Sequence, residues 1–263
     1  MKITLIAGID VGSRTTKAVL INEAAEIVAR YSSPTSVRLD AVGETAIKSL
    51  CPNGKKPSYV ASTGYGRYQV KSRDIQITEI TCHAYGAHFL YPKTKCVLDI
   101  GAQNSRAIKI LDNGRVKTFK MNDKCASGAG RFLERVAQAM ELELEQIGEM
   151  SLRSADPQTI SSICAVLAES EIINHVTEGK KIEDILMGAH KSIIDRVTAL
   201  IRQVGVESEV TMTGGVAKNV GMVKAFEEKI GMKVNVHKDS EYAGAIGAAL
   251  LGLRRLQKQT ANN

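Results

Sequence analysis

The chain has 263 residues, of which 44% are hydrophobic and 24% are charged, so it is neither collagen-like nor disordered. Its formal net charge is +7, but basic clusters with interleaved aromatic residues are lacking, and we expect no nucleic-acid partner. No run of about 18 apolar residues occurs, so we expect no membrane-spanning helix.

The first predicted element is a β-hairpin. Residues 3–9 are apolar and lead into the turn Asp10-Val11-Gly12, after which residues 18–21 are apolar again. Turn residues between apolar runs are typical of a hairpin, and the segment lacks the cleavage site of a signal peptide. We therefore expect a cytoplasmic protein. Further along, residues 58–62 predict a strand, residues 63–67 a loop and residues 80–90 a helix.

A second hairpin has the same plan. An apolar strand ends in Asp99-Ile100-Gly101, polar residues follow to Ser105, and residues 107–111 predict the return strand. Two such hairpins predict two similar halves that face each other across a cleft.

The last part of the chain is predicted to be rich in helices. Apolar residues recur every three or four positions over 129–140, 165–176, 182–203 and 220–229. Short strands are predicted at 210–213, which runs into Gly214-Gly215, and at 233–236, which precedes a final helix that begins at Ala243.

Three glycine turns after strands indicate a phosphate-binding protein. Neither a Walker A loop nor a Rossmann fingerprint is present, but Gly12, Gly101 and Gly214 would each permit close approach of a phosphate to the backbone. Asp10 and Asp99 precede the first two turns and can hold Mg²⁺, which retains water ligands.

The order of these turns resembles the phosphate-1, phosphate-2 and adenosine motifs of the sugar kinase, actin and chaperone ATPase superfamily. The resemblance implies an α/β fold of two ribonuclease-H-like (actin-like) halves, with ATP or ADP in the cleft between them. We expect one half at 1–94 plus 247–263 and the other at 95–246. The nucleotide-binding residues implied by this match are Gly12, Ser13, Thr15, Thr16, Lys17, Gly101, Ala102, Asn104, Gly214, Gly215 and Ala217.

Two of the five cysteines, Cys125 and Cys164, each precede a predicted helix. A helix N-terminus stabilises a thiolate, and an iron–sulfur cluster takes four cysteine ligands. Two thiolates per chain would therefore need a second chain to complete the set. The alternative is that both cysteines simply pack in the first turns of their helices.

The segments around these cysteines, 122–134 and 161–171, resemble the ATPase family of 2-hydroxyacyl-CoA dehydratase activators and benzoyl-CoA reductase ATP-binding subunits. The resemblance implies one 4Fe–4S cluster that bridges two identical or homologous subunits through Cys125 and Cys164 of each. It also implies that ATP hydrolysis drives a low-potential electron into iron–sulfur subunits of an acyl-CoA reductase or dehydratase, with reduced ferredoxin or flavodoxin as the donor.

The phosphate-2 turn departs from the activators, which usually have Asp-Ile-Gly-Gly-Gln-Asp. Here Ala102 and Asn104 replace the second Gly and the second Asp, and Asn104 cannot act as a carboxylate base. Either Gln103 orients the attacking water, with Asp10 and Asp99 on Mg²⁺, or this subunit hydrolyses ATP slowly. The catalytic residues we expect are therefore Asp10, Asp99 and Gln103.

The turn and the Cys-Ala-Ser-Gly sequence look closer to the benzoyl-CoA reductase branch, which we favour. A dehydratase activator is the first alternative. A small metabolite kinase of the same fold, and an ATP-switch module without catalysis, are alternatives from other classes. Cys82 is expected to pack within a helix and His83 to cap it or form a hydrogen bond, with metal ligation as the alternative. Arg14, Arg67 and Arg131 are candidates for contact with phosphates or an acidic partner.

Overall fold

The computed structural model of the chain describes residues 4–51, 54, 56–122, 130–161, 165–206 and 208–261. Its contacts divide it into two compact units: Met1–Lys93, Ile110–Val116 and Asp239–Asn263 form unit 1, and Thr94–Lys109 and Lys117–Lys238 form unit 2. Compared with the expected halves, residues 110–116 and 239–246 fall in unit 1 and Thr94 falls in unit 2. The assignment of the two actin-like halves to 1–94 plus 247–263 and to 95–246 stays a prediction.

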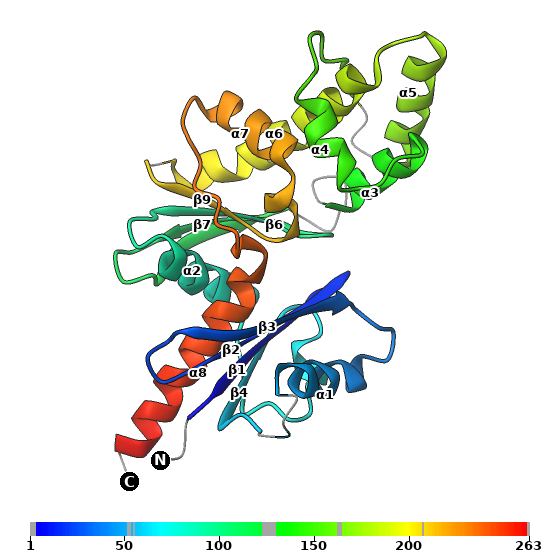
Figure 1. Ribbon diagram of the computed structural model, residues 1–263. Helices are drawn as coiled ribbons and strands as arrows, with labels where there is room; N and C mark the ends of the chain where they lie inside the picture. The colour runs from blue at the N-terminus through cyan, green and yellow to red at the C-terminus, as the bar shows by residue number, and fades with distance from the viewer. Residues whose placement is uncertain are drawn as a thin grey trace. The chain divides into compact units, whose positions relative to one another are not determined.

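Unit 1 is a five-stranded sheet with helices on both faces (Figure 1). Its strand order is β3-β2-β1-β4-β5, where β4 is parallel to β1 and β2 is antiparallel to it. The strands are β1 Ile6–Val11, β2 Thr15–Ile21, β3 Ile27–Pro34, β4 Tyr59–Thr63 and β5 Ile75–Gln76. The helices are α1 Leu39–Leu50, η1 Arg67–Gln69, α2 Glu79–Leu90, η4 Ser240–Tyr242 and α8 Ala243–Ala261.

Alternation along β1 sends its side chains to two different cores. Ala7 and Ile9 belong to the cluster that includes residues of α1, whereas Ile6 belongs to the cluster that includes residues of α8. On the α8 face, a Cβ at Gly8 would lie 2.0 Å from the carbonyl oxygen of Ala245, so glycine is what lets the helix reach the strand. Asp10 follows two residues later and is therefore on the α8 face.

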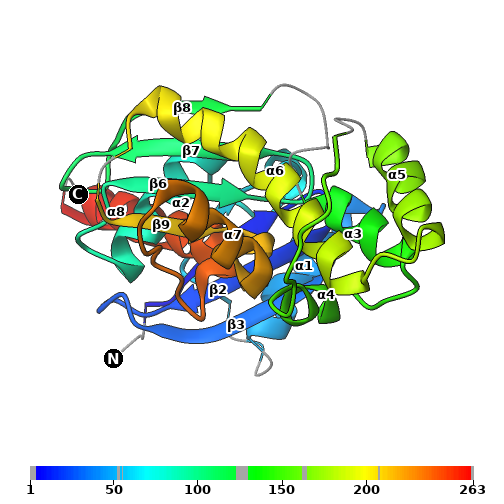
Figure 2. The same ribbon diagram turned by 90° about the horizontal axis from the view of Figure 1, so that it is seen from above.

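Unit 2 is a four-stranded sheet of order β8-β7-β6-β9 with a helical layer (Figure 2). Its strands are β6 Cys96–Ile100, β7 Ser105–Ile110, β8 Val116–Met121 and β9 Val210–Thr213. Its helices are α3 Gly130–Ala139, α4 Gln146–Ser151, α5 Ala165–Thr177, α6 Ile182–Val204, η3 Gly215–Lys218 and α7 Val220–Ile230. Helix α6 is the centre of the core, because α4, α5 and α7 all contact it.

Both predicted hairpins are confirmed, and the two sheets repeat one plan. In each, an antiparallel hairpin (β1–β2 or β6–β7) is joined by a later parallel strand, β4 or β9. Asp10 pairs in register with Thr63, and Asp99 pairs in register with Thr213. The repeat recognised at the two Asp-x-Gly turns thus extends to the Thr-Gly sequences at the ends of β4 and β9.

One predicted strand, 233–236, is wrong. Only an isolated bridge between Thr211 and Asn235 forms there. Asn235 exchanges hydrogen bonds with Val210 and Met212 of β9, whereas the N–H of Val234, on the opposite side of the backbone, donates to a carboxylate oxygen of Glu227 at 3.0 Å. Over the described ranges, no helix combines the length and the apolar character needed to cross a bilayer.

Candidate functional site

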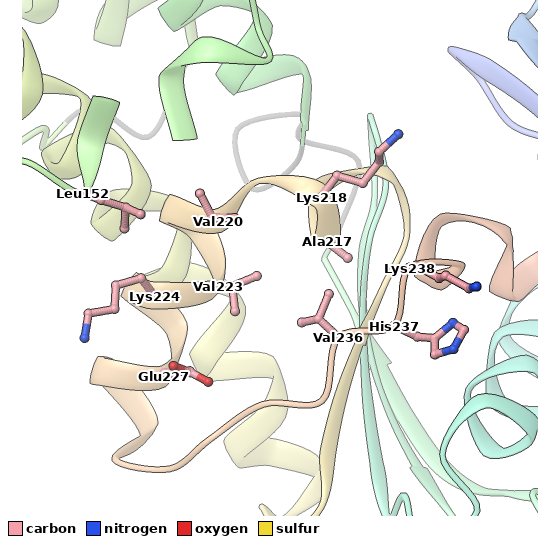
Figure 3. Close-up of a pocket in the computed structure, with 10 residues that line it drawn as sticks. All are labelled: Leu152, Ala217, Lys218, Val220, Val223, Lys224, Glu227, Val236, His237 and Lys238. Carbon is pink, nitrogen blue, oxygen red and sulfur yellow. The ribbon is translucent and has the colours of Figure 1, made fainter. Parts of the chain in front are cut away.

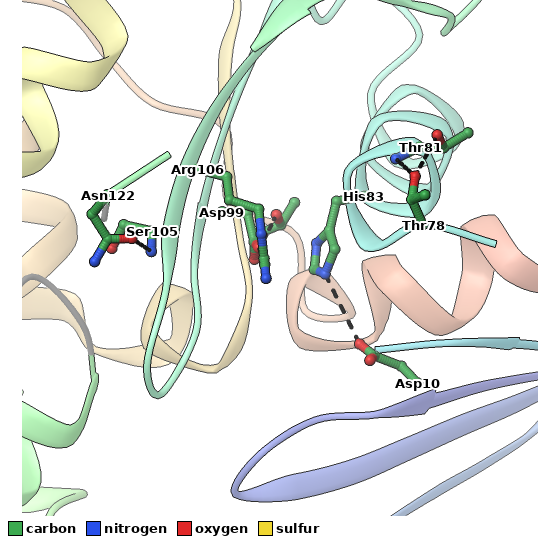
Figure 4. A network of polar contacts seen from close by, with 9 residues as sticks. Asp10, Thr78, Thr81, His83, Asp99, Ser105, Arg106 and Asn122 are labelled. Atoms are coloured by element: carbon green, nitrogen blue, oxygen red, sulfur yellow. Dashed lines mark hydrogen bonds and ion pairs between the residues drawn. The ribbon is translucent and has the colours of Figure 1, made fainter. Parts of the chain in front are cut away.

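The carboxylate of Asp10 is enclosed by groups from three elements of unit 1 (Figure 4). Gly64 follows β4 with φ +93°, and a Cβ there would lie 2.5 Å from Asp10 Oδ1. A Cβ at Gly244, in the first turn of α8, would lie 2.4 Å from Oδ2. The Nε2 of His83 in α2 lies 3.9 Å from Oδ2. The Asp10 side chain is still 14% exposed, so it can reach a ligand.

The turn after β1 contains the predicted phosphate-1 residues, and Thr35 stabilises it. The Thr35 hydroxyl donates to the carbonyl oxygen of Gly12 at 2.8 Å and lies 2.9 Å from the buried hydroxyl of Thr16. A hydroxyl has one proton, so Thr16 must donate in the second bond. The Thr16 proton is thus used inside the protein, and the half-buried Ser13 and Thr15 are the hydroxyls left to meet a phosphate.

Asp99, at the corresponding place in unit 2, is held by a cation (Figure 4). Its Oδ2 lies 2.6 Å from Nη1 of Arg106, the residue directly opposite on β7. The side chains are 1% and 6% exposed, respectively. Oδ1 accepts a long hydrogen bond of 3.5 Å from the Thr213 hydroxyl. The pair compensates the carboxylate's charge, so Asp99 is less open to a cation than Asp10.

The phosphate-2 turn is tight and is bonded to the start of α3. The N–H of Gly101 donates to the carbonyl oxygen of Asn104 at 2.9 Å, which closes the turn. The carbonyl oxygens of Gly101 and Ala102 accept from the N–H groups of Gly130 and Arg131 at 2.8 and 2.9 Å. Gln103 and Asn104 are half-buried at the tip. This turn therefore fixes the first described residues of α3.

The third predicted turn repeats the geometry of Gly64. Gly214 has φ +87°, and a Cβ there would lie 2.6 Å from Asp99 Oδ1, so only glycine fits. Gly215 is exposed, and Ala217 is buried in η3. Asn219, which follows η3, caps helix α7: its side-chain oxygen accepts from the N–H of Met222 at 3.0 Å. Its Nδ2 lies 3.2 Å from Nε2 of His190.

His190 is fully buried in α6, and burial lowers its pKa to about 3. Its ring is therefore neutral at physiological pH. As a neutral acceptor at Nε2 it can receive the proton of the Asn219 amide, and this supports the cap beneath the Gly214 turn.

A hollow of about 540 Å³ adjoins η3 (Figure 3). It has an apolar wall and lysines at its rim. Its lining residues are Leu152, Ala217, Lys218, Val220, Val223, Lys224, Glu227, Val236, His237 and Lys238. Among the predicted nucleotide-binding residues, Ala217 is the one that reaches this hollow.

The two predicted cluster ligands, Cys125 and Cys164, lie outside the described residues. The helices that follow them, α3 and α5, pack against each other within unit 2. Within the part of the chain that the structure describes, no group of three or more His, Cys, Asp or Glu side chains is arranged to hold a metal ion. Mg²⁺ in nucleotide sites usually takes only one or two carboxylates, along with waters and phosphates.

The candidate arginines differ in their surroundings. Arg67 is held within its own loop, where Nη1 donates to the carbonyl oxygen of Gly64 at 3.1 Å and the guanidinium lies 4.5 Å from the Tyr68 ring centroid. Arg14 and Arg131 are exposed. Sequence reasoning missed Arg106, Thr35 and the contact of His83 with Asp10.

Comparison with known proteins shows which proteins the whole chain resembles. The sequence profile of the BadF/BadG/BcrA/BcrD ATPase family matches residues 7–252. The 2-hydroxyisocaproyl-CoA dehydratase activator of Clostridioides difficile is 39% identical over 266 residues, which cover 97% of this chain and 98% of that protein. One of the subunits of benzoyl-CoA reductase from Thauera aromatica is 39% identical over 269 residues, which cover 97% of this chain and 95% of that protein.

The fold of the chain is also similar to that of a solved dehydratase activator. The activator of the 2-hydroxyisocaproyl-CoA dehydratase from Clostridium difficile, with bound ADPNP, superposes with a TM-score of 0.92 at 37% identity. The match covers 99% of this chain and 98% of that one. The α/β, actin-like fold expected from the glycine turns is confirmed by this similarity.

Proposed function

Since the chain belongs to the BadF/BadG/BcrA/BcrD ATPase family, we propose that it is an ATP-hydrolysing subunit that drives low-potential electrons into an acyl-CoA reductase or dehydratase. The observation that carries the proposal is the repeated carboxylate geometry. Asp10 and Asp99 are each the next-to-last residue of a central strand, beside a left-handed glycine, Gly64 or Gly214, whose missing side chain leaves room at the carboxylate.

The residues fit a magnesium nucleotide. Asp10 has a partly exposed carboxylate that can hold water ligands of the ion, and Ser13 and Thr15 offer hydroxyl donors in the turn after β1. When bound, Mg²⁺ neutralises negative charge on the phosphates. Asp99 is already paired with Arg106, so we assign the closer contact with the water shell of the ion to Asp10 and the secondary one to Asp99.

Gln103 is the residue we propose to orient the attacking water. Its amide can both accept and donate a hydrogen bond, and it lies at the half-buried tip of the turn after β6. Lys17 and the glycines Gly12, Gly101 and Gly215 complete the phosphate contacts in this proposal. Ala217 and the hollow beside η3 would receive part of the adenosine.

Coupling to electron transfer would run through α3. Cys125 and Cys164 from two subunits would hold the 4Fe–4S cluster, which supplies a one-electron carrier. The hydrogen bonds from Gly130 and Arg131 to the phosphate-2 turn connect that turn to the helix that begins five residues after Cys125. A ligand shifts a conformational equilibrium only if it binds the two states differently, and loss of the γ-phosphate beside this turn provides such a difference.

Within the family we favour a benzoyl-CoA reductase type of subunit. Identity does not decide the question, because the activator and the reductase subunit are both 39% identical to the chain. The choice rests on Ala102 and Asn104, where the activators usually have Gly and Asp. A dehydratase activator is the alternative. A metabolite kinase is disfavoured because Asn104 offers no carboxylate base.

The partners follow from this proposal. They are a second ATPase subunit, identical or homologous, the iron–sulfur subunits that reduce the acyl-CoA, and reduced ferredoxin or flavodoxin as the donor. The two branches differ in the second ATPase subunit: an activator would pair with itself, and a reductase subunit would pair with an unlike one.

The test is to purify the protein without oxygen and measure iron and ATP hydrolysis. We expect a brown dimer with about four irons, formed by the protein alone or together with an unlike ATPase subunit; Cys125→Ser and Cys164→Ser should abolish the iron and the matched control Cys51→Ser should leave it unchanged. A full iron content in the homodimer would indicate an activator, whereas iron that appears only with an unlike ATPase subunit would indicate a reductase. Colourless protein that phosphorylates a metabolite would refute the proposal.

A further inference from the structure

His83 occupies a fixed place in unit 1 because α2 and α8 touch backbone to backbone. A Cβ at Gly86 would lie 1.9 Å from the carbonyl oxygen of Ala243, and one at Gly247 would lie 1.8 Å from that of Cys82. Two glycines thus allow the helices to approach more closely than any side chain would permit. Neither helix can slide without a clash, so the residue after Cys82 is held at the start of α8.

At that place, His83 meets the carboxylate of Asp10. The ring Nε2 lies 3.9 Å from Oδ2, and the His83 side chain is only 6% exposed (Figure 4). A Cβ at Gly244 would lie 2.9 Å from Nε2 and 2.4 Å from Oδ2, so the absence of that side chain is what lets the two groups face each other. The distance is longer than a hydrogen bond, but polar contacts of this kind often tighten when a ligand binds.

In unit 2, the equivalent carboxylate has a different kind of partner. Asp99 is held by Arg106, a permanent cation on the neighbouring strand, at 2.6 Å. Asp10 has as its neighbour a histidine from a helix. The two equivalent carboxylates therefore each have a nitrogen-bearing partner, and the partners come from different elements.

We propose that His83 is a positioning residue for Asp10: its Nε2 holds Oδ2 and so fixes the rotation of the carboxylate that magnesium nucleotide requires. The inference rests on the proposed function of Asp10. His83 itself contacts neither phosphate nor metal in this proposal. A histidine that only fills the space between α2 and α8 would be equally buried, so the test must separate orientation of Asp10 from packing.

The experiment compares His83→Leu, His83→Gln and the control His88→Gln, which changes a histidine of the same helix that packs against the turn at Gly114. The affinity for ADPNP is measured by calorimetry with Mg²⁺ and with EDTA, on the purified protein. We expect His83→Leu to weaken binding with Mg²⁺ by roughly 10- to 100-fold, as for other groups that support a metal-binding carboxylate, and to leave binding in EDTA unchanged. His83→Gln, which keeps an N–H donor, should restore most of the loss, and His88→Gln should behave as wild type.

Equal weakening with and without Mg²⁺, or no weakening at all, would overturn the role of His83. If His83→Leu does not fold, His83→Gln and His83→Asn decide, because the shorter amide cannot reach Oδ2 and should lose the affinity that the longer one keeps. A wild-type protein that binds no nucleotide would instead refute the proposed function. The two failures are therefore distinguishable.

Discussion

Removing the guanidinium of Arg106 should destabilise unit 2 more than any other single charge change on β7. Arg106→Met leaves the Asp99 carboxylate, 1% exposed, without its partner at 2.6 Å. With an effective dielectric constant of about 20, the attraction at that distance is about 6 kcal/mol, and the desolvation of both groups offsets part of it. We expect a net loss of about 3–5 kcal/mol, the range for a broken buried pair.

The assay is thermal unfolding followed by circular dichroism. A loss of that size should lower the Tm by roughly 6–20 °C in a domain of this size. Lys117→Met, exposed on the neighbouring strand β8, is the control and should change stability by less than about 0.5 kcal/mol. Adding Asp99→Asn to Arg106→Met removes the uncompensated charge and should recover much of the Tm. An Arg106→Met Tm within about 2 °C of wild type would show that the ion pair does not stabilise unit 2 to this extent.

Three further predictions concern the turns and their supports. Gly64→Ala would place a methyl group 2.5 Å from Asp10 Oδ1 at φ +93°, so calorimetry should detect at least about tenfold weaker ADPNP binding. The control Gly54→Ala, also at positive φ but in open space, should bind ADPNP as wild type does. Thr35→Val leaves the carbonyl oxygen of Gly12 and the hydroxyl of Thr16 without their partner, which should lower the free energy of unfolding by about 1–3 kcal/mol in urea denaturation. The pKa of His190 is about 3 in the folded protein and about 6.5 in the unfolded chain, so the unfolded state binds a proton first as the pH falls. The free energy of unfolding should therefore decrease as the pH drops from about 6.5 towards 3, by up to about 1.4 kcal/mol per pH unit. A Tm against pH curve with the same slope in His190→Gln would contradict this.

Local pattern was enough to predict most elements of the fold. Helix α6 was expected at 182–203 and extends over Ile182–Val204, and β9 has the predicted bounds of 210–213. These segments have strong periodicity or clear turn residues at their ends. The edge strand β3 was not predicted, because its alternation is between half-buried and exposed positions and it ends at a proline. Helix α1 was also not predicted: it has Gly43 in its interior and no side-chain cap at its start.

The site was only partly predictable, since its carboxylates are marked by local turns and their partners are not. Arg106 could have been found: Asp99 and Arg106 are equally far from the closing pair of the turn, Ile100 and Ser105, so hairpin register places them opposite each other. No such signal exists for His83. It comes from a helix that reaches Asp10 only because glycines in α2 and α8 allow close packing, which is a tertiary property.

If the proposed function holds, the bound nucleotide changes the energy of an electron on the cluster at Cys125 and Cys164. The direct measurement is the midpoint potential of the anaerobically purified dimer, determined by spectroscopic redox titration with ADPNP and with ADP. We predict different potentials for the two nucleotides, and no difference in Asp10→Asn. The same potential in both nucleotide states of the wild-type protein would show that the nucleotide does not drive the electron.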